Sequence, residues 1–299
     1  MKKELTVGVD IGGSHITAGF VNMQDKTAAI DTVVRQKVNS KASADEIITA
    51  WCRVIRNVWS MHGVSNTRLG FAMPGPFDYE EGICQIKGFD KYESLYQMNI
   101  RQELSSRLNV PGHDILFRND AEAFLDGELF CGAGQGYKHA IGITLGTGLG
   151  SAVSHNGNTK DAALSVLEYC GDKIEEQVST RGLINSYYAL TGVQLKDAET
   201  IASLYATDEH AVQVFKKFGE GLSWFLEYFI KKENPEVLII AGNIANAMHL
   251  FMPDVKNNLI AAGVRLPEIV KSTLNENAAL IGGACCFIKE LKESKTVIE

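Results

Sequence analysis

The sequence predicts a mixed α/β protein of two similar domains that face each other across a cleft. Two stretches carry this prediction, residues 5–21 (LTVGVDIGGSHITAGFV) and 139–154 (HAIGITLGTGLGSAVS), and each reads as a strand, a glycine-rich turn and a second strand. Asp10 of the first stretch corresponds to Thr144 of the second. Because a hairpin opens each half and helices then alternate with strands, we expect mixed sheets in two related domains rather than one wholly parallel sheet.

Composition and charge narrow the class of protein. The 299 residues suggest about two domains, with 45% hydrophobic and 22% charged residues. The net charge of -7, a pI near 5.6 and the lack of any basic run exclude a general nucleic-acid binder. No apolar stretch approaches the roughly 18 residues of a membrane span, and the N-terminus enters a strand at once, unlike a signal peptide. We expect a cytoplasmic protein without nucleic-acid or membrane partners.

Six cysteines are scattered without a CxxC pair, which indicates reduced thiols and no zinc site.

The remaining elements follow from periodicity and capping signals. Ser43 and Glu46 form a predicted capping box, and the apolar residues that follow them have helical spacing. Residues 156–172 show no clear pattern. The expected further strands are 33–38, 69–73, 115–117 and 237–240, and the expected helices are 100–108, 121–130, 179–190, 208–230, one from 245 and one over about 277–291. We place the domains at 1–117, completed by 277–299, and at 118–276.

The two glycine turns are candidate phosphate sites. Glycine has no Cβ, so its backbone N–H groups stay open to an anion, and the Asp10 carboxylate could hold a divalent cation through water. An ordinary hairpin turn capped by the aspartate is the alternative for the first turn alone. The recurrence of the turn favours two clamps for one polyphosphate. The predicted contacts are Gly12, Gly13, Ser14, Gly146, Thr147 and Gly148.

Two further motifs follow predicted strands. Asn119 and Asp120 end one strand and begin a helix, where an aspartate could act as general base on a hydroxyl that attacks phosphorus. The alternative is a helix N-cap, for which both residue types are preferred. Pro74-Gly75-Pro76 makes a rigid loop just past another strand, in the position where open α/β sheets bind ligands.

Five motifs together carry a family resemblance. DIGGS, AMPGPFD, NDAEA, GTGLGSA and NPEVLIIAGN occur in this order along essentially the whole chain, which resembles the ROK family of sugar kinases and repressors. The resemblance implies two actin-like (ribonuclease H-like) domains around a cleft, as in the sugar-kinase/hexokinase superfamily. Repressors of the family carry an N-terminal helix-turn-helix arm, whereas the first strand here begins at about Leu5, so we expect the kinase branch.

The resemblance also implies an activity and residue roles. It implies ATP-dependent phosphorylation of a hexose or hexose derivative, with ATP as donor, Mg²⁺ as cofactor and a homodimeric state; polyphosphate is the alternative donor. Asp120 would be the catalytic base, and Asp10 would serve Mg²⁺ through water. The implied sugar contacts are Asn119, Asp120, Gly75 and Glu175, and Gly242 would contact the nucleotide.

The sequence departs from the family pattern on the acceptor side. The usual Glu-x-Gly-His is replaced by Ala163, Leu164, Ser165 and Val166, the zinc motif is reduced to Cys170, and Gln85 stands for a sugar-binding asparagine. Each lost polar contact would cost about 1–3 kcal/mol of binding free energy. Three interpretations stay open: a different sugar, an alignment that puts Glu168 in place of the missing carboxylate, or a catalytically weak sugar-binding regulator.

Overall fold

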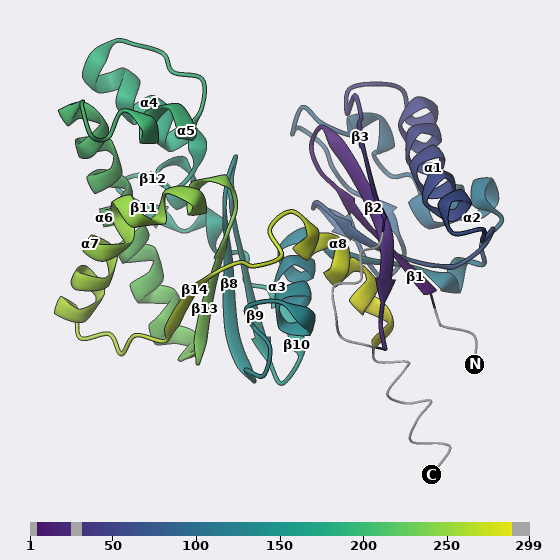
Figure 1. The fold of residues 1–299 in the computed structure, drawn as a ribbon. Coiled ribbons are helices and arrows are strands. Elements are labelled where there is room, and N and C mark those ends of the chain that lie inside the picture. The colour runs from purple at the N-terminus through teal and green to yellow at the C-terminus, as the bar shows by residue number, and fades with distance from the viewer. Residues whose placement is uncertain (1–4, 25–31, 289–299) are drawn as a thin grey trace. The chain divides into compact units, whose positions relative to one another are not determined.

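The computed structural model describes residues 5–24 and 32–288. The described chain forms two compact units, one built from residues up to 135 and from 276 onward, the other from 136–275. Each unit contains a mixed five-stranded sheet (Figure 1), so the predicted α/β class with a hairpin opening each half is confirmed. Residues 118–135, assigned above to the second domain, make their contacts within the first unit. The domain division proposed from sequence stays a prediction.

The sheet of the first unit is organised around β1 (Leu5–Ile11). This strand pairs antiparallel with β2 (His15–Asn22), beyond which β3 (Val33–Lys37) is also antiparallel. On its other side β1 pairs parallel with β4 (Arg68–Met73), which pairs parallel with β7 (Ile115–Asn119). Three parallel strands therefore end at one edge of this sheet.

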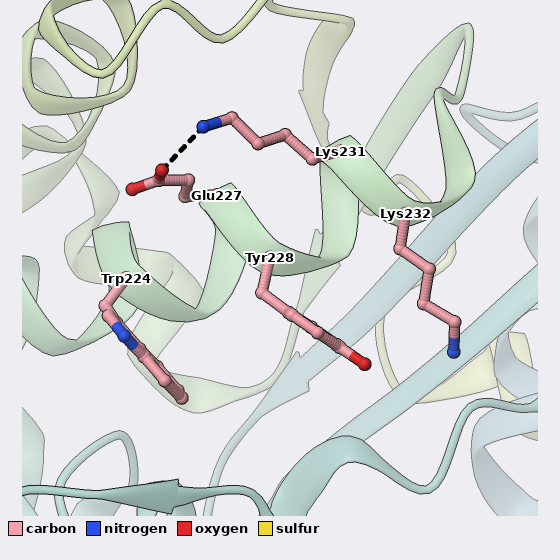
Figure 2. A pocket seen from close by; sticks show the side chains of 5 residues that line it. All are labelled: Trp224, Glu227, Tyr228, Lys231 and Lys232. Carbon is pink, nitrogen blue, oxygen red and sulfur yellow. Dashed lines mark hydrogen bonds and ion pairs between the residues drawn. The ribbon is translucent and has the colours of Figure 1, made fainter.

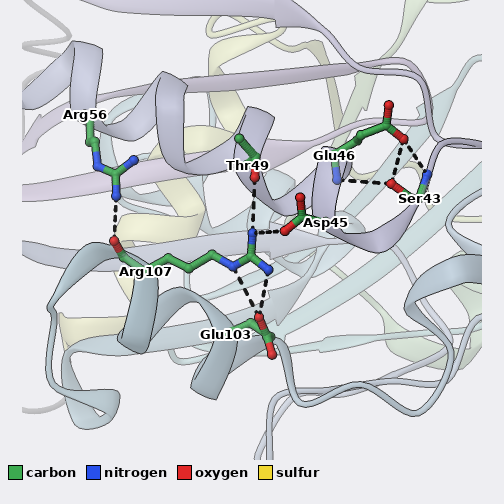
Figure 3. Close-up of polar contacts among 7 residues, drawn as sticks. All are labelled: Ser43, Asp45, Glu46, Thr49, Arg56, Glu103 and Arg107. Carbon is green, nitrogen blue, oxygen red and sulfur yellow. Dashed lines mark hydrogen bonds and ion pairs between the residues drawn. The ribbon is translucent and has the colours of Figure 1, made fainter.

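Helix α1 (Ala44–Met61) packs against β2 and β3. Its predicted capping box is confirmed, because the Ser43 N–H donates to Glu46 Oε2 at 3.0 Å while the Ser43 hydroxyl accepts from the Glu46 N–H at 3.4 Å (Figure 3). Its apolar face is buried as expected. Arg107 of α2 (Ile100–Leu108) donates to Asp45 at 2.8 Å, which ties the two helices together.

Helices α3 (Asp120–Cys131) and α8 (Asn277–Ala284) pack on each other, and α8 also packs on β1 and β4. A Cβ at Gly282 would lie 1.6 Å from the carbonyl oxygen of Ala123, so this close helix pair requires glycine there. The predicted final helix continues as a 3₁₀ turn, η6 (Cys285–Phe287). The part of that prediction beyond residue 288 lies outside the described residues.

The sheet of the second unit repeats this plan. Strand β8 (His139–Leu145) pairs antiparallel with β9 (Leu149–His155), which pairs with β10 (Asn158–Asp161). On the other side β8 pairs parallel with β13 (Val237–Ala241), followed by β14 (Glu268–Lys271). The predicted second hairpin and the buried strand 237–240 are thus confirmed.

Helices pack around a phenylalanine-rich core in this unit. Phe215 and Phe218 of the long helix α6 are buried and pack with Phe251 of α7, and the buried Phe225 packs with Phe229 of the same helix. A 3₁₀ turn, η5, precedes α7, where a helix from 245 was expected. The helices are α4 (Thr180–Thr191), α5 (Ala198–Ser203), α6 (Glu209–Glu233), η5 (Asn243–Ala247) and α7 (Met248–Ala261).

Short elements complete the chain. The segment 156–172 contains β10, η3 (Leu164–Val166), β11 (Glu168–Tyr169) and the start of β12 (Asp172–Lys173), and two-residue strands are too short to show periodicity. The others are β5 (Phe77–Asp78), β6 (Ile83–Cys84), η1 (Glu93–Leu95), η2 (Gly112–Asp114) and η4 (Ile174–Glu176). Among the described residues, no helix combines the length and apolarity that crossing a membrane needs.

Candidate active site

Strand register gathers several predicted site residues at one edge of the first sheet. Asp10 near the end of β1 pairs with Ala72 of β4, and Met73 pairs with Asn119 at the end of β7. The first glycine turn, the Pro74–Pro76 loop and the Asn119-Asp120 pair therefore leave the carboxyl ends of adjacent strands. Ligands of open α/β sheets bind at this kind of edge.

A buried tyrosine, Tyr92, bonds to the backbone of the first turn. The Gly12 N–H donates to the His15 carbonyl at 2.9 Å, which closes the turn. The Tyr92 hydroxyl donates to the Gly12 carbonyl at 2.6 Å, and the Tyr92 side chain is fully buried. Gly13 and Ser14 are exposed, so the turn presents its tip to solvent while its base is fixed.

Asp10 carries an altered proton affinity. Burial of its carboxyl group, followed by the negative charge of Asp120, raises the pKa of Asp10 to about 7; Arg35 opposes the shift and Glu276 adds to it. Arg35 forms an ion pair with Glu276. The side chains of Asp10 and Asp120 thus interact at this edge. The described residues contain no group of three or more His, Cys, Asp or Glu side chains that could hold a metal ion.

The N-cap alternative is confirmed for Asn119, whereas the general-base role of Asp120 stays a prediction. Asn119 is the N-cap of α3: its side-chain oxygen accepts from the N–H groups of Ala121 at 2.8 Å and Glu122 at 3.3 Å. Its amide nitrogen donates to the Tyr79 hydroxyl at 3.2 Å. Asp120 is exposed at the first position of the helix and accepts from the Ala121 N–H at 2.9 Å. The cap therefore fixes the backbone from which the Asp120 carboxylate projects.

The loop after β4 is connected to the same network. The Tyr79 hydroxyl donates to the Met73 carbonyl at 3.1 Å, and a Cβ at Gly75 would lie 3.3 Å from that hydroxyl oxygen. The Gln85 N–H donates to the Pro76 carbonyl at 3.1 Å. Tyr79 thus links the Gly75 loop to Asn119.

In the second unit, the four predicted phosphate and nucleotide contacts lie beside one another. The Gly146 N–H donates to the Gly148 carbonyl at 3.0 Å, and Thr147 at the tip is exposed. Ala241 pairs with Thr144, which brings Gly242 next to this second turn. Gly242 has φ of +91°, and a Cβ there would lie 2.2 Å from the Leu145 carbonyl oxygen. Only glycine fits at this position.

Glu175 lies at the same turn. Its Oε2 atom accepts from the Leu149 N–H at 3.0 Å, and a Cβ at Gly148 would lie 2.5 Å from that atom. Arg181 is 3.8 Å from the other carboxylate oxygen. The predicted sugar contact is therefore bonded to the backbone of the predicted phosphate turn.

Residues 163–166, which depart from the family pattern, expose the apolar side chain of Val166. Val166 is 62% exposed, and Ala163 has a left-handed backbone with φ of 50°. Glu168 is exposed on β11 and pairs with Lys173 of β12 through the backbone. Cys170 is a free, exposed thiol.

Sequence reasoning did not find Tyr79, Tyr92 or Lys91. Tyr79 follows the AMPGPFD motif directly, so its proximity to the loop was a usable signal. Tyr92 bonds to Gly12, and the Lys91 side chain lies near Gly13, through tertiary contacts only. No periodicity or motif marks such contacts.

A hollow in the surface of the second unit lies on helix α6. It measures about 600 Å³ and is lined by five side chains of α6, with Glu227 and Lys231 paired at 2.7 Å (Figure 2). None of the predicted site residues lines it. It is therefore not the candidate active site.

The family model described as "ROK family" matches residues 6–162 and 165–290. The chain belongs to the ROK family. Its described units have the actin-like fold of the family's sugar kinases, as the resemblance implied.

Named relatives of similar length are sugar kinases. The chain is 24% identical to the glucokinase of Thermotoga maritima, over 97% of this chain and 99% of that one. It is 25% identical to the N-acetyl-D-glucosamine kinase of Mannheimia succiniciproducens, over 94% and 98%. A crystal structure of a ROK family glucokinase from Streptomyces griseus in complex with glucose and AMPPNP has a TM-score of 0.75 at 22% identity, covering 94% of this chain and 98% of that one.

Proposed function

We propose that this ROK-family sugar kinase transfers the terminal phosphoryl group of ATP to a hydroxyl of a hexose or hexosamine. One observation carries the proposal: the register of β1, β4 and β7 brings Asp10, the Gly75 loop and Asn119-Asp120 to one sheet edge. The relatives named for glucose and N-acetylglucosamine support this substrate class. AMPPNP in the Streptomyces griseus glucokinase supports ATP as donor.

In this proposal Asp120 is the general base. Its carboxylate takes the proton of the sugar hydroxyl while the hydroxyl oxygen attacks the terminal phosphorus, and the bond from that phosphorus to the bridging oxygen breaks to release ADP. The exposure of Asp120 and the capping bonds of Asn119 support this role. Asn119, Gly75 and Glu175 are the proposed sugar contacts. The proposed phosphate contacts are Gly12, Gly13, Ser14, Gly146, Thr147, Gly148 and Gly242.

The residues at this edge fit a magnesium ion. Mg²⁺ keeps several waters and uses one or two carboxylates together with substrate phosphates, and Asp10 beside the charge of Asp120 supplies such a donor set. Asp10 would hold the ion through water. When bound, the ion neutralises charge on the phosphates. Asp10 has to be ionised to hold the ion. A nearby cation favours the ionised carboxylate and would therefore lower the raised pKa of Asp10.

A second candidate is a sugar-binding regulator with little turnover. It is favoured by the exposed Val166 and by Ala163, which stand where family members have a histidine and a glutamate. Loss of those contacts would weaken hexose binding and leave the donor side intact. The two candidates differ in whether bound sugar is phosphorylated.

A coupled phosphotransfer assay tests the proposal. Glucose, other hexoses, amino sugars and N-acetylated sugars are each offered with Mg-ATP and, separately, with polyphosphate. We expect turnover with at least one hexose or hexosamine and ATP. Turnover only with polyphosphate would change the donor. Binding of Mg-ATP and sugar without product in any reaction would favour the regulator and contradict the kinase proposal.

A further inference from the structure

Lys91 lies over the first glycine turn. A Cβ placed on Gly13 would be 4.0 Å from Cδ of Lys91, and the Lys91 side chain is only partly exposed. Within residues 5–24 and 32–288, no acidic side chain pairs with its ammonium group. A lysine that lies along the tip of this turn without an acidic partner is positioned to meet an anion there.

Both chain neighbours of Lys91 are anchored. The Tyr92 hydroxyl bonds to Gly12, its N–H donates to the Ser40 carbonyl at 2.7 Å, and its ring contacts Trp51 edge-on at 5.7 Å. On the other side, Asp90 forms an ion pair with Lys41. The backbone at Lys91 is therefore fixed relative to the turn.

The same two neighbours adopt unfavourable backbone conformations. Asp90 has φ of 56° and Tyr92 has φ of 57°, in the left-handed region that bulky residues such as tyrosine rarely occupy. Such strain persists only where surrounding bonds fix it, and it concentrates at functional sites. Lys91 lies between these two left-handed residues, next to the strained Tyr92.

We propose that Lys91 contacts the phosphate chain of the phosphoryl donor at the first glycine turn. The proposal deepens the proposed function and rests on it. A cationic side chain beside the Gly13 turn offsets the negative charge of the donor's phosphates. The recognised chemistry is a phosphate chain, which either ATP or inorganic polyphosphate could provide. Lys91 would bind the donor in the ground state and help neutralise charge as the phosphoryl group is transferred.

Lys91→Met, Lys91→Arg and the control Lys87→Met test this. Lys87 is an exposed lysine of the same segment, with its ammonium 5.1 Å from the centre of the Tyr96 ring. In the coupled assay, we expect Lys91→Met to lower kcat/KM for the donor about tenfold or more, the value of a charge-assisted contact. The KM for sugar and the thermal midpoint should stay near wild type, Lys91→Arg should recover most of the loss, and Lys87→Met should change nothing. A donor kcat/KM within twofold of wild type in Lys91→Met would overturn the assignment while the kinase function stands.

A binding measurement separates this proposal from the proposed function. Calorimetric titration of the wild-type protein and Lys91→Met with Mg-ATP, and with Mg-tripolyphosphate, needs no turnover. Weaker binding of both ligands to Lys91→Met supports contact with the phosphate chain, even if no sugar is phosphorylated. Equal binding by the two proteins, or no binding by the wild type, would contradict it. Loss for one ligand alone would identify which donor Lys91 meets.

Discussion

The two glycine turns share a backbone plan but differ in the side chains around them. Each lies between antiparallel strands beside a parallel neighbour. At the first turn Asp10 and Asp120 interact at the strand ends. At the second, Thr144 occupies the place of Asp10, and the Glu175 carboxylate is bonded to the Leu149 N–H. In the proposed function the repeated backbone binds phosphate in both units, and the general base, Asp120, belongs to the first unit alone.

The turns also differ in the contacts that fix their backbones. A tyrosine side chain bonds to Gly12 in the first, and the backbone of Gly242 lies directly against Leu145 in the second. A side chain can shift to relieve an added atom, but packed backbone cannot. Substitution of Gly242, which packs against the second turn, should therefore affect stability more sharply than a substitution at the first turn, where replacing Asp10 changes the charge.

The largest effect is expected from Gly242→Ala. Its φ of +91° and the Leu145 oxygen 2.2 Å from an added Cβ predict a loss of about 3 kcal/mol or more in unfolding free energy. Urea unfolding measures it. Gly146→Ala is the control, because nothing lies within 4 Å of its added Cβ. Similar stabilities for the two variants would contradict the backbone contact described at Gly242.

A smaller effect, dependent on pH, is expected from Asp10→Asn. The pKa of Asp10 is about 7 in the folded protein, against an ordinary value of 3.8, so the folded state holds this proton more tightly. Wild-type stability therefore falls as pH rises from about 4 to 7, because ionisation is penalised only in the folded state. Without Mg²⁺, Asp10→Asn should be more stable than wild type at pH 8, and the two should converge near pH 4.

Urea unfolding at several pH values provides the measurement for Asp10→Asn. Asp254→Asn, at an exposed position of α7, serves as the control. A lower stability of Asp10→Asn than of wild type at pH 8 would contradict the claim that the ionised Asp10 carboxylate destabilises the folded protein.

The smallest effect is expected from Glu175→Gln. The amide oxygen of glutamine can still accept the Leu149 N–H, so the fold should be retained, but the charge-assisted contact with a sugar hydroxyl would be lost. We expect an increase of about tenfold in the KM for sugar. Glu176→Gln is the matched control, since Glu176 pairs with Arg181. An unchanged KM in Glu175→Gln would restrict Glu175 to supporting the turn.

Local signals in the sequence predicted most of the fold. The hairpins, the Ser43–Glu46 capping box and the helix 100–108 coincide with the structure because each depends on residues close along the chain. Residues 156–172 escaped assignment because their elements are too short for periodicity. The motifs at Asp10, Gly75 and Asn119 were visible in sequence, and strand register was needed to bring them together. Tyr79 lies directly after a recognised motif and could have been found from it, whereas Tyr92 and Lys91 reach the first turn only through tertiary contacts and carry no local signal.

The most direct test of the account is the Asp120→Asn variant. Asn119 keeps its capping bonds in this variant, so the helix start should be undisturbed. We predict that calorimetry will show sugar and Mg-ATP affinities close to wild type, while kcat falls by at least about 100-fold through loss of the general base. Turnover near the wild-type rate with the same affinities would contradict the assignment of Asp120.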